Sequence, residues 1–222
     1  METYETEEQQ VAAIKAWWKE NYKKVVFIVV LGIGGILGAQ SYQKNQQLTK
    51  EAASDHFNQL ISGVQNKQED IILGRAELLK NDHANSPYAI QASLIKAKTL
   101  VDKKEYESAI NELSWAAEHT KDESLKQIAF IRKIKLMMQL EKNDQAIQEI
   151  KPLIDDSKNQ SKDSQMNTNP FMPVLNEIYG DLLASIDKKE EAKKAYDKAL
   201  SGFILSGVST ELLQIKRNDL GE

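Results

Sequence analysis

The chain of 222 residues contains no cysteine. It therefore cannot form a disulfide, and it offers no thiolate to act as a nucleophile or to bind a metal. A cysteine-free chain is compatible with an oxidising compartment, although it does not identify one. Histidine is nearly as scarce, and His56, His83 and His119 lie too far apart in the sequence to follow the spacing of a metal site.

Other signatures of catalysis are also missing. No serine lies in a nucleophile elbow, no pair of histidine and carboxylate stands out, and the glycine cluster at 32–38 belongs to an apolar run rather than a phosphate loop. The 29 Lys and Arg are interspersed with 33 Asp and Glu, and the net charge of −4 does not suit a phosphate-binding surface. We therefore expect no enzyme activity, cofactor, bound metal, small-molecule substrate or nucleic-acid partner.

Helix-breaking residues are few, with 4 Pro and 10 Gly in the whole chain. Ala, Leu, Lys, Glu and Gln are plentiful, and these residues favour helices. Alternation of β-branched residues is nowhere sustained, so the sequence predicts an all-α fold. Without its N-terminal segments the chain keeps roughly 180 residues, which suffices for one domain with a hydrophobic core.

What the sequence does contain is an uncharged apolar run over residues 25–39, bounded by Lys23 and Lys24. Extended to Tyr42 the run has 18 residues, the short end of what a helix needs to cross a bilayer. A core helix of a soluble protein usually has a polar face, which this run lacks. A cleaved signal peptide begins with a short basic segment, whereas five Glu lie among the 24 residues before this run. Against these two alternatives we predict an uncleaved transmembrane helix over residues 23–42.

Basic residues flank this helix unequally. Four lysines lie within ten residues before the run, but only Lys44 and Lys50 lie comparably near its other end. Because Lys and Arg set membrane topology, residues 1–22 are predicted to be a cytoplasmic tail and residues 43–222 to lie across the membrane, as in a single-pass type II protein.

Inside the apolar run, Gly34 and Gly38 form a Gly-x-x-x-Gly pair. Small residues four apart allow two helices to approach closely in lipid, so this pair predicts a contact with another membrane helix. The alternative is chance in a glycine-rich span.

Beyond helices expected at 43–66 and 69–80, the chain is self-similar from Pro87 onward. Each unit has a helix, a polar turn containing lysine, and a second helix with an alanine near its start. The expected helix pairs cover 88–101 with 105–119, 125–140 with 144–154, and 174–186 with 190–201.

The alanines of these units are Ala109, Ala146 and Ala192. The last unit, with Gly180 and Tyr196 besides its alanine, resembles the tetratricopeptide repeat pattern most closely. The alanines lie 37 and 46 residues apart, against about 34 in that pattern. We assign the excess in the second interval to an exposed polar loop at about 155–170, which is either a connector or a partner-binding segment.

The order of these parts is similar to that of the YfgM family. The resemblance rests on the acidic start Tyr4–Glu8, the segment Trp17–Asn21, the apolar Leu31–Gly34 and the repeat-like domain. It implies an ancillary subunit of the SecYEG translocon in the bacterial inner membrane, with its repeat domain in the periplasm. It also implies association with a membrane-anchored periplasmic chaperone of the peptidyl-prolyl isomerase type, and a role in passing newly translocated proteins to periplasmic chaperones.

Stacked helix pairs present a concave groove from their first helices, and such a groove would bind protein partners. The residues expected to line it are Gln91, Leu94, Lys98, Ile128, Ile131, Lys135, Met138, Val174, Ile178 and Asp181. The alternative function is a regulatory scaffold that controls a stress-signalling pathway through the cytoplasmic tail. A secreted enzyme or soluble repeat protein, released by cleavage, is the third hypothesis.

Overall fold

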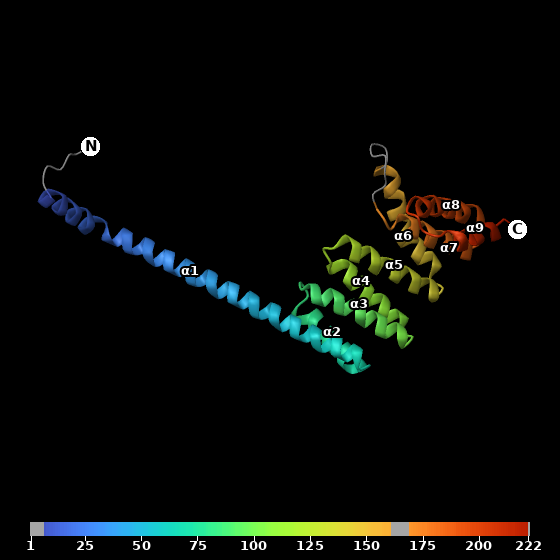
Figure 1. Ribbon diagram of the computed structural model, residues 1–222, viewed down its shortest axis with the longest axis horizontal. Coiled ribbons are helices and arrows are strands. Elements are labelled where there is room, and N and C mark those ends of the chain that lie inside the picture. The colour runs from blue at the N-terminus through green and yellow to red at the C-terminus, as the bar shows by residue number, and fades with distance from the viewer. Residues whose placement is uncertain (1–6, 161–168, 222) are drawn as a thin grey trace. The chain divides into compact units, whose positions relative to one another are not determined.

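The computed structural model describes residues 7–160 and 169–221, in which all regular secondary structure is helical (Figure 1). This confirms the predicted all-α fold class. The helices are α1 (Glu7–Gln65), α2 (Glu69–Asp82), α3 (Pro87–Asp102), α4 (Tyr106–His119), α5 (Glu123–Gln139), α6 (Asn143–Gln160), α7 (Met172–Ser185), α8 (Lys189–Leu205) and α9 (Glu211–Asp219). The chain divides into two compact units, Met1–Ala52 and Ala53–Glu222.

The first unit contains the apolar run, which lies wholly within α1. Its large aliphatic and aromatic side chains are exposed; Phe27 and Ile28, for example, are 63% and 67% accessible. This is the one helix among the described residues that is long and apolar enough to cross a membrane. None of the residues in its most apolar stretch is buried. A side-chain surface of this kind is expected of a helix that contacts lipid.

The second unit is built from four helical hairpins rather than the three predicted. The end of α1 packs against α2, and the pairs α3 with α4, α5 with α6 and α7 with α8 follow in order. Buried apolar clusters continue from one hairpin to the next, as in a solenoid whose repeats contact only their neighbours.

All four hairpins turn in the same way. The turn residue has a positive φ and is not glycine; it is Lys67, Lys104, Glu141 or Asp187, at intervals of 37, 37 and 46 residues. In the second hairpin the Lys104 N–H donates to Val101 O and the Glu105 N–H donates to Leu100 O, both at 2.8 Å. This pair of bonds is a Schellman motif, and equivalent bonds close the other three turns.

The helices of a hairpin approach each other most closely just beside this turn. In three hairpins a large residue of the first helix faces a buried alanine of the second, as Leu100 faces Ala109. In the first hairpin the sizes are exchanged. Gly63 stands at the position of Leu100 and Ile72 at the position of Ala109, and a Cβ on Gly63 would lie 3.3 Å from Ile72 Cγ1. The alanine pattern used to find the repeats therefore missed this hairpin.

Helix ends also follow local rules. Ser86 caps α3 by accepting from the Tyr88 N–H at 3.2 Å, with Pro87 in the first helical position, as the sequence indicates. Asp122 caps α5 through the backbone N–H groups of Ser124 and Leu125.

Two features at the C-terminal side differ from the expectation. Helix α6 continues to Gln160, so residues 155–160 are helical and the predicted loop begins too early; residues 161–168 lie outside the described part of the chain. The reason is that polar residues without proline or glycine can extend a helix that is already nucleated. Helix α9 was not predicted, because its nine residues are too few for a clear apolar period.

The last hairpin fixes α9 through a polar cluster. The Tyr196 hydroxyl donates to Asp181 at 2.8 Å, and Lys216 of α9 donates to Asp181 and Glu177 at 3.0 Å. The ring of Tyr196 lies against Gly180, where any Cβ would overlap it. Burial and the Asp181 carboxylate together raise the pKa of Tyr196, so this hydroxyl stays protonated as a donor.

The contact between Gly180 and Tyr196 predicts the effect of an alanine substitution. Gly180→Ala is expected to destabilise the second unit by about 1–3 kcal/mol, because the added methyl forces the tyrosine ring out of place. Gly74→Ala is the matched control, since Gly74 lies in α2 with no atom near its Cβ position, and it should stabilise by about 0.5–1 kcal/mol. Urea unfolding of the detergent-solubilised chain, followed by circular dichroism, measures both. Equal effects of the two substitutions would contradict this packing.

Candidate protein-binding cleft

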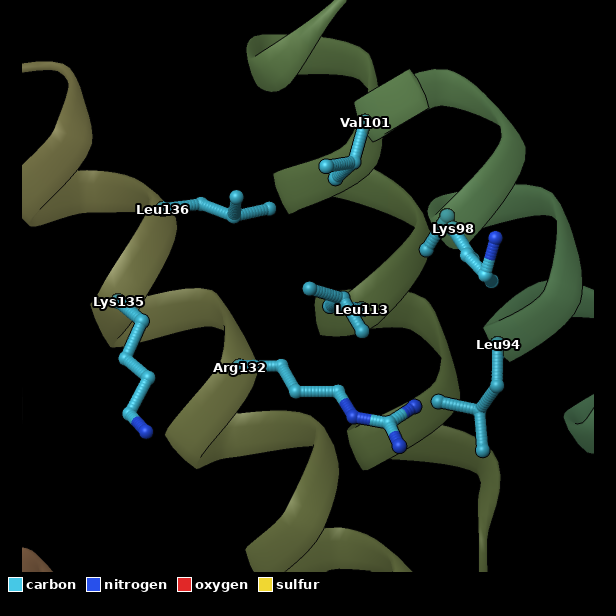
Figure 2. Close-up of a pocket in the computed structure, with 8 residues that line it drawn as sticks. Leu94, Lys98, Val101, Leu113, Arg132, Lys135 and Leu136 are labelled. Atoms are coloured by element: carbon cyan, nitrogen blue, oxygen red, sulfur yellow. The ribbon is translucent and has the colours of Figure 1, made fainter.

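A cleft of about 370 Å³ opens between α3 and α5, with α4 as its floor (Figure 2). It lies wholly within the second unit. The residues that line it are Leu94, Ala97, Lys98, Val101, Leu113, Arg132, Lys135 and Leu136. A volume in this range suits a few apolar side chains of a bound ligand or protein segment.

Helical periodicity explains why these residues meet. Leu94, Lys98 and Val101 lie one turn apart along one face of α3. Leu113 points from α4 into the space between α3 and α5, and Leu136 points toward it from α5 (Figure 2). Leu113 is itself 2% exposed and belongs to the core that joins α3, α4 and α5. The floor of the cleft is therefore apolar and firmly held.

The rim of the cleft is cationic. Lys98, Arg132 and Lys135 line it and are exposed, and no carboxylate is among the lining residues. Lys98 donates to Asp102 of the same helix at 2.8 Å, whereas within the described residues neither Arg132 nor Lys135 has an ion-pair partner. Arg132 extends from α5 across the cleft toward Leu94 (Figure 2). Its guanidinium thus lies over apolar side chains with its donors available.

A buried carboxylate lies on the other side of α4. Glu112 is 6% exposed and accepts from Lys80 of α2 at 2.8 Å and from Ser93 of α3 at 2.8 Å. Lys96 of α3 completes the cluster at 2.8 Å and also donates to Glu77 of α2 at 2.6 Å. Glu112 therefore joins three helices through charge-assisted hydrogen bonds.

These partners determine the protonation of the cluster. Burial alone would raise the pKa of the Glu112 carboxyl, but the hydrogen bonds from Lys80, Lys96 and Ser93 outweigh burial and lower that pKa. Burial likewise opposes the charge on Lys96, and its bonds to Glu112 and Glu77 raise its pKa. Glu112 is consequently ionised near neutral pH and fully engaged on the side of α4 that faces α2.

The structure brings three of the ten predicted groove residues together, namely Leu94, Lys98 and Lys135. Gln91 is exposed on α3 but does not line the cleft, and Ile128 on α5 is half-buried without lining it. Ile131, Met138 and Val174 pack against the core between α5, α6 and α7.

The remaining two predicted residues are occupied elsewhere. Ile178 is 3% exposed within that same core, so it presents no surface to a partner. Asp181 accepts from Tyr196 and Lys216 and is half-buried. Ile178 is therefore covered by α5 and α6, whereas Asp181 is held by α8 and α9.

Sequence reasoning missed five lining residues: Ala97, Val101, Leu113, Arg132 and Leu136. A period of 3.6 residues was a usable signal for Val101, which follows Leu94 by two turns. Leu113 could not be found in this way. It lies on α4, the second helix of its hairpin, whereas the groove was expected to be lined by first helices only.

In the first unit, Gly34 and Gly38 lie on α1 with no heavy atom within 4 Å of their Cβ positions. The same holds for Gly32 and Gly35 of this helix. Within residues 7–160 and 169–221, no group of three potential metal ligands is found.

Residues 15–222 match the family described as a tetratricopeptide repeat-like domain. An ancillary SecYEG translocon subunit of Aggregatibacter actinomycetemcomitans is 29% identical over 214 residues, which cover 96% of this chain and 97% of the relative. The ancillary SecYEG translocon subunit of Escherichia coli K12 is 28% identical over 220 residues, covering 99% of both chains. The likeness thus includes the apolar helix as well as the hairpins.

The Glu112 cluster predicts a pH-dependent stability. Glu112→Gln should destabilise the second unit by roughly 1–3 kcal/mol at neutral pH, because Lys80 and Lys96 lose a charged acceptor. Since the folded-state pKa of Glu112 is lowered, its contribution is present above the unfolded value of about 4.3 and is lost as pH falls below it. The free energies of unfolding of the wild type and of Glu112→Gln, measured at pH 7 and in steps below pH 5, test this prediction.

The matched control is Glu118→Gln, which removes an exposed carboxylate of the same helix. It should change the unfolding free energy little at either pH. A wild-type advantage over Glu112→Gln that persists unchanged at the lowest pH would refute the assignment.

Proposed function

Because the chain belongs to the tetratricopeptide repeat-like family of ancillary SecYEG translocon subunits, the YfgM family, we propose that it is a non-enzymatic, membrane-tethered adaptor at the SecYEG translocon. The observation that carries this proposal is the likeness to such subunits over nearly the whole chain, apolar helix included. In this role the repeat domain binds protein partners and passes newly translocated proteins to periplasmic chaperones.

The apolar part of α1 is the proposed anchor in the inner membrane. The exposed aliphatic side chains and the uncharged sequence of residues 25–39 support residues 23–42 as the membrane-spanning segment. The excess of lysine before the apolar run of residues 25–39 supports a cytoplasmic N-terminus and a periplasmic repeat domain. Gly34 and Gly38 would form the contact with a membrane helix of the translocon or of a partner, since small residues four apart allow close approach of two helices.

The cleft between α3 and α5 is the proposed docking place for protein partners. An apolar floor supplies binding free energy, and cations at the rim supply orientation. One proposed partner is the membrane-anchored periplasmic chaperone of the peptidyl-prolyl isomerase type that the family resemblance implies. Anchoring both proteins in one membrane raises their effective concentration, so a cleft of modest affinity suffices.

The glycine pair generates a test of the translocon contact. Gly34→Leu with Gly38→Leu should lower recovery of SecYEG with the affinity-purified chain by roughly tenfold, or about 1.4 kcal/mol of association free energy, because leucine blocks close helix approach. Gly32→Leu with Ala39→Leu is the matched control on the opposite helix face and should leave recovery unchanged. Failure of the wild-type chain to recover SecYEG would reject the proposed function.

Topology generates the second test. Protease added to intact spheroplasts should digest the repeat domain and leave a fragment protected by the membrane, because only residues before the span lie inside. The readout is an immunoblot with tags at each end, and lysed spheroplasts, in which both tags are lost, serve as the control. A C-terminal tag that survives in intact spheroplasts would reverse the proposed orientation.

A further inference from the structure

We propose that the cleft between α3 and α5 binds an acidic amphipathic segment of a partner protein. The aliphatic side chains of that segment fill the space above Leu113, and its carboxylates pair with Arg132 and Lys135. This inference rests on the proposed function, in which the cleft is a docking place, and it adds the chemistry of the occupant.

The apolar half of the occupant follows from the walls of the cleft. Leu94, Val101 and Leu136 are half-buried side chains arranged around Leu113, and no polar uncharged side chain interrupts them. Covering such side chains with aliphatic groups removes further apolar surface from water. Leucine or isoleucine side chains, presented one helical turn apart, would fit a trough between two helices.

The acidic half follows from the rim. Three cations and no carboxylate line the cleft, in a chain whose net charge is −4. The surplus of positive charge is therefore local to this place and is not a general property of the chain. A carboxylate that approaches meets Arg132, whose planar guanidinium can bind it with two parallel hydrogen bonds.

Burial of the acidic side chain next to the floor strengthens this charge selection. Glu112 precedes Leu113 on α4, but it points to the opposite side and is occupied by Lys80 and Lys96. No carboxylate of the floor competes with the occupant for Arg132. A basic segment, in contrast, would bring its ammonium groups toward Arg132 and Lys135 without a compensating acceptor.

The test uses the full chain in detergent and three fluorescent helical peptides with leucine at the same i, i+3, i+4 and i+7 positions. The peptides carry Glu, Gln or Lys at all other positions, and binding is measured by fluorescence anisotropy at low and moderate salt. We expect the Glu peptide to bind at least tenfold tighter than the Lys peptide, with the Gln peptide between them. The preference should weaken as salt increases.

Charge reversal separates this interaction from general electrostatic attraction. Arg132→Glu with Lys135→Glu should reverse the preference, so that the Lys peptide binds tighter than the Glu peptide. Lys121→Glu with Lys126→Glu is the matched control, because both lysines are exposed near or on α5, carry the same charge and do not line the cleft. The control should keep the preference of the wild type.

Several outcomes would overturn the proposal. Equal binding of the Glu and Lys peptides, or a preference that survives reversal of Arg132 and Lys135, would show that the cleft does not select acidic segments. Self-association of the chain that is lost in the reversed variant would assign the cleft to a second copy. Binding to anionic phospholipid vesicles that is lost in that variant would assign its cations to lipid. If the wild-type chain recovers SecYEG and any of these results is obtained, the proposed function stands. Only the proposal that the cleft binds an acidic segment is then rejected.

Discussion

The second unit depends on one steric constraint. In each hairpin two helices approach closely beside a tight turn whose central residue has a positive φ. At this point two side chains face each other, and there is room for only one large side chain. Ala109, Ala146 and Ala192 meet the constraint from the second helix, whereas Gly63 meets it from the first. The turns themselves use residues other than glycine at positive φ, each at a steric cost of about 1–2 kcal/mol. The packing beside each turn must offset that cost, so the turn is stable only together with the small residue that allows this packing.

This constraint explains what the sequence could predict of the fold. Alanine at a fixed distance after a polar turn revealed the three later hairpins, and their helix ends lie within three residues of the expected ones except at α6 and α8. The first hairpin obeys the same steric rule with the sizes exchanged, and a search for alanine on the second helix cannot see Ile72 opposite Gly63. A search for one small and one large residue at the two facing positions, in either order, would have found this hairpin.

The cleft was less predictable than the fold, because its lining depends on the rotation of each helix. Lys98 and Lys135 were found by repeat position alone, but Arg132 was missed, although it lies one turn before Lys135 on the same face of α5. Asp181 holds on α7 the repeat position of Lys98 and Lys135, yet its carboxylate belongs to the Tyr196 cluster, and Ile178 of the same helix is buried in the core with α5 and α6. The position of a residue in a repeat therefore predicts which face it occupies, while the neighbouring helices decide whether that face stays open.

Rotation also links the buried charge cluster to the chemistry of the cleft. Successive residues of a helix point about 100° apart, so Glu112 and Leu113 present very different groups to the two sides of α4. The bonds from Lys80, Ser93 and Lys96 hold Glu112 on the inner side, toward α2 and α3. A rotation of α4 by a single position would bring this carboxylate into the floor, where it would pair with Arg132 and exclude an acidic ligand. A buried ion cluster contributes little net stability compared with apolar packing. Its value here lies in specificity, because it fixes the one orientation of α4 that keeps the floor apolar and leaves Arg132 and Lys135 without an ion-pair partner among the described residues.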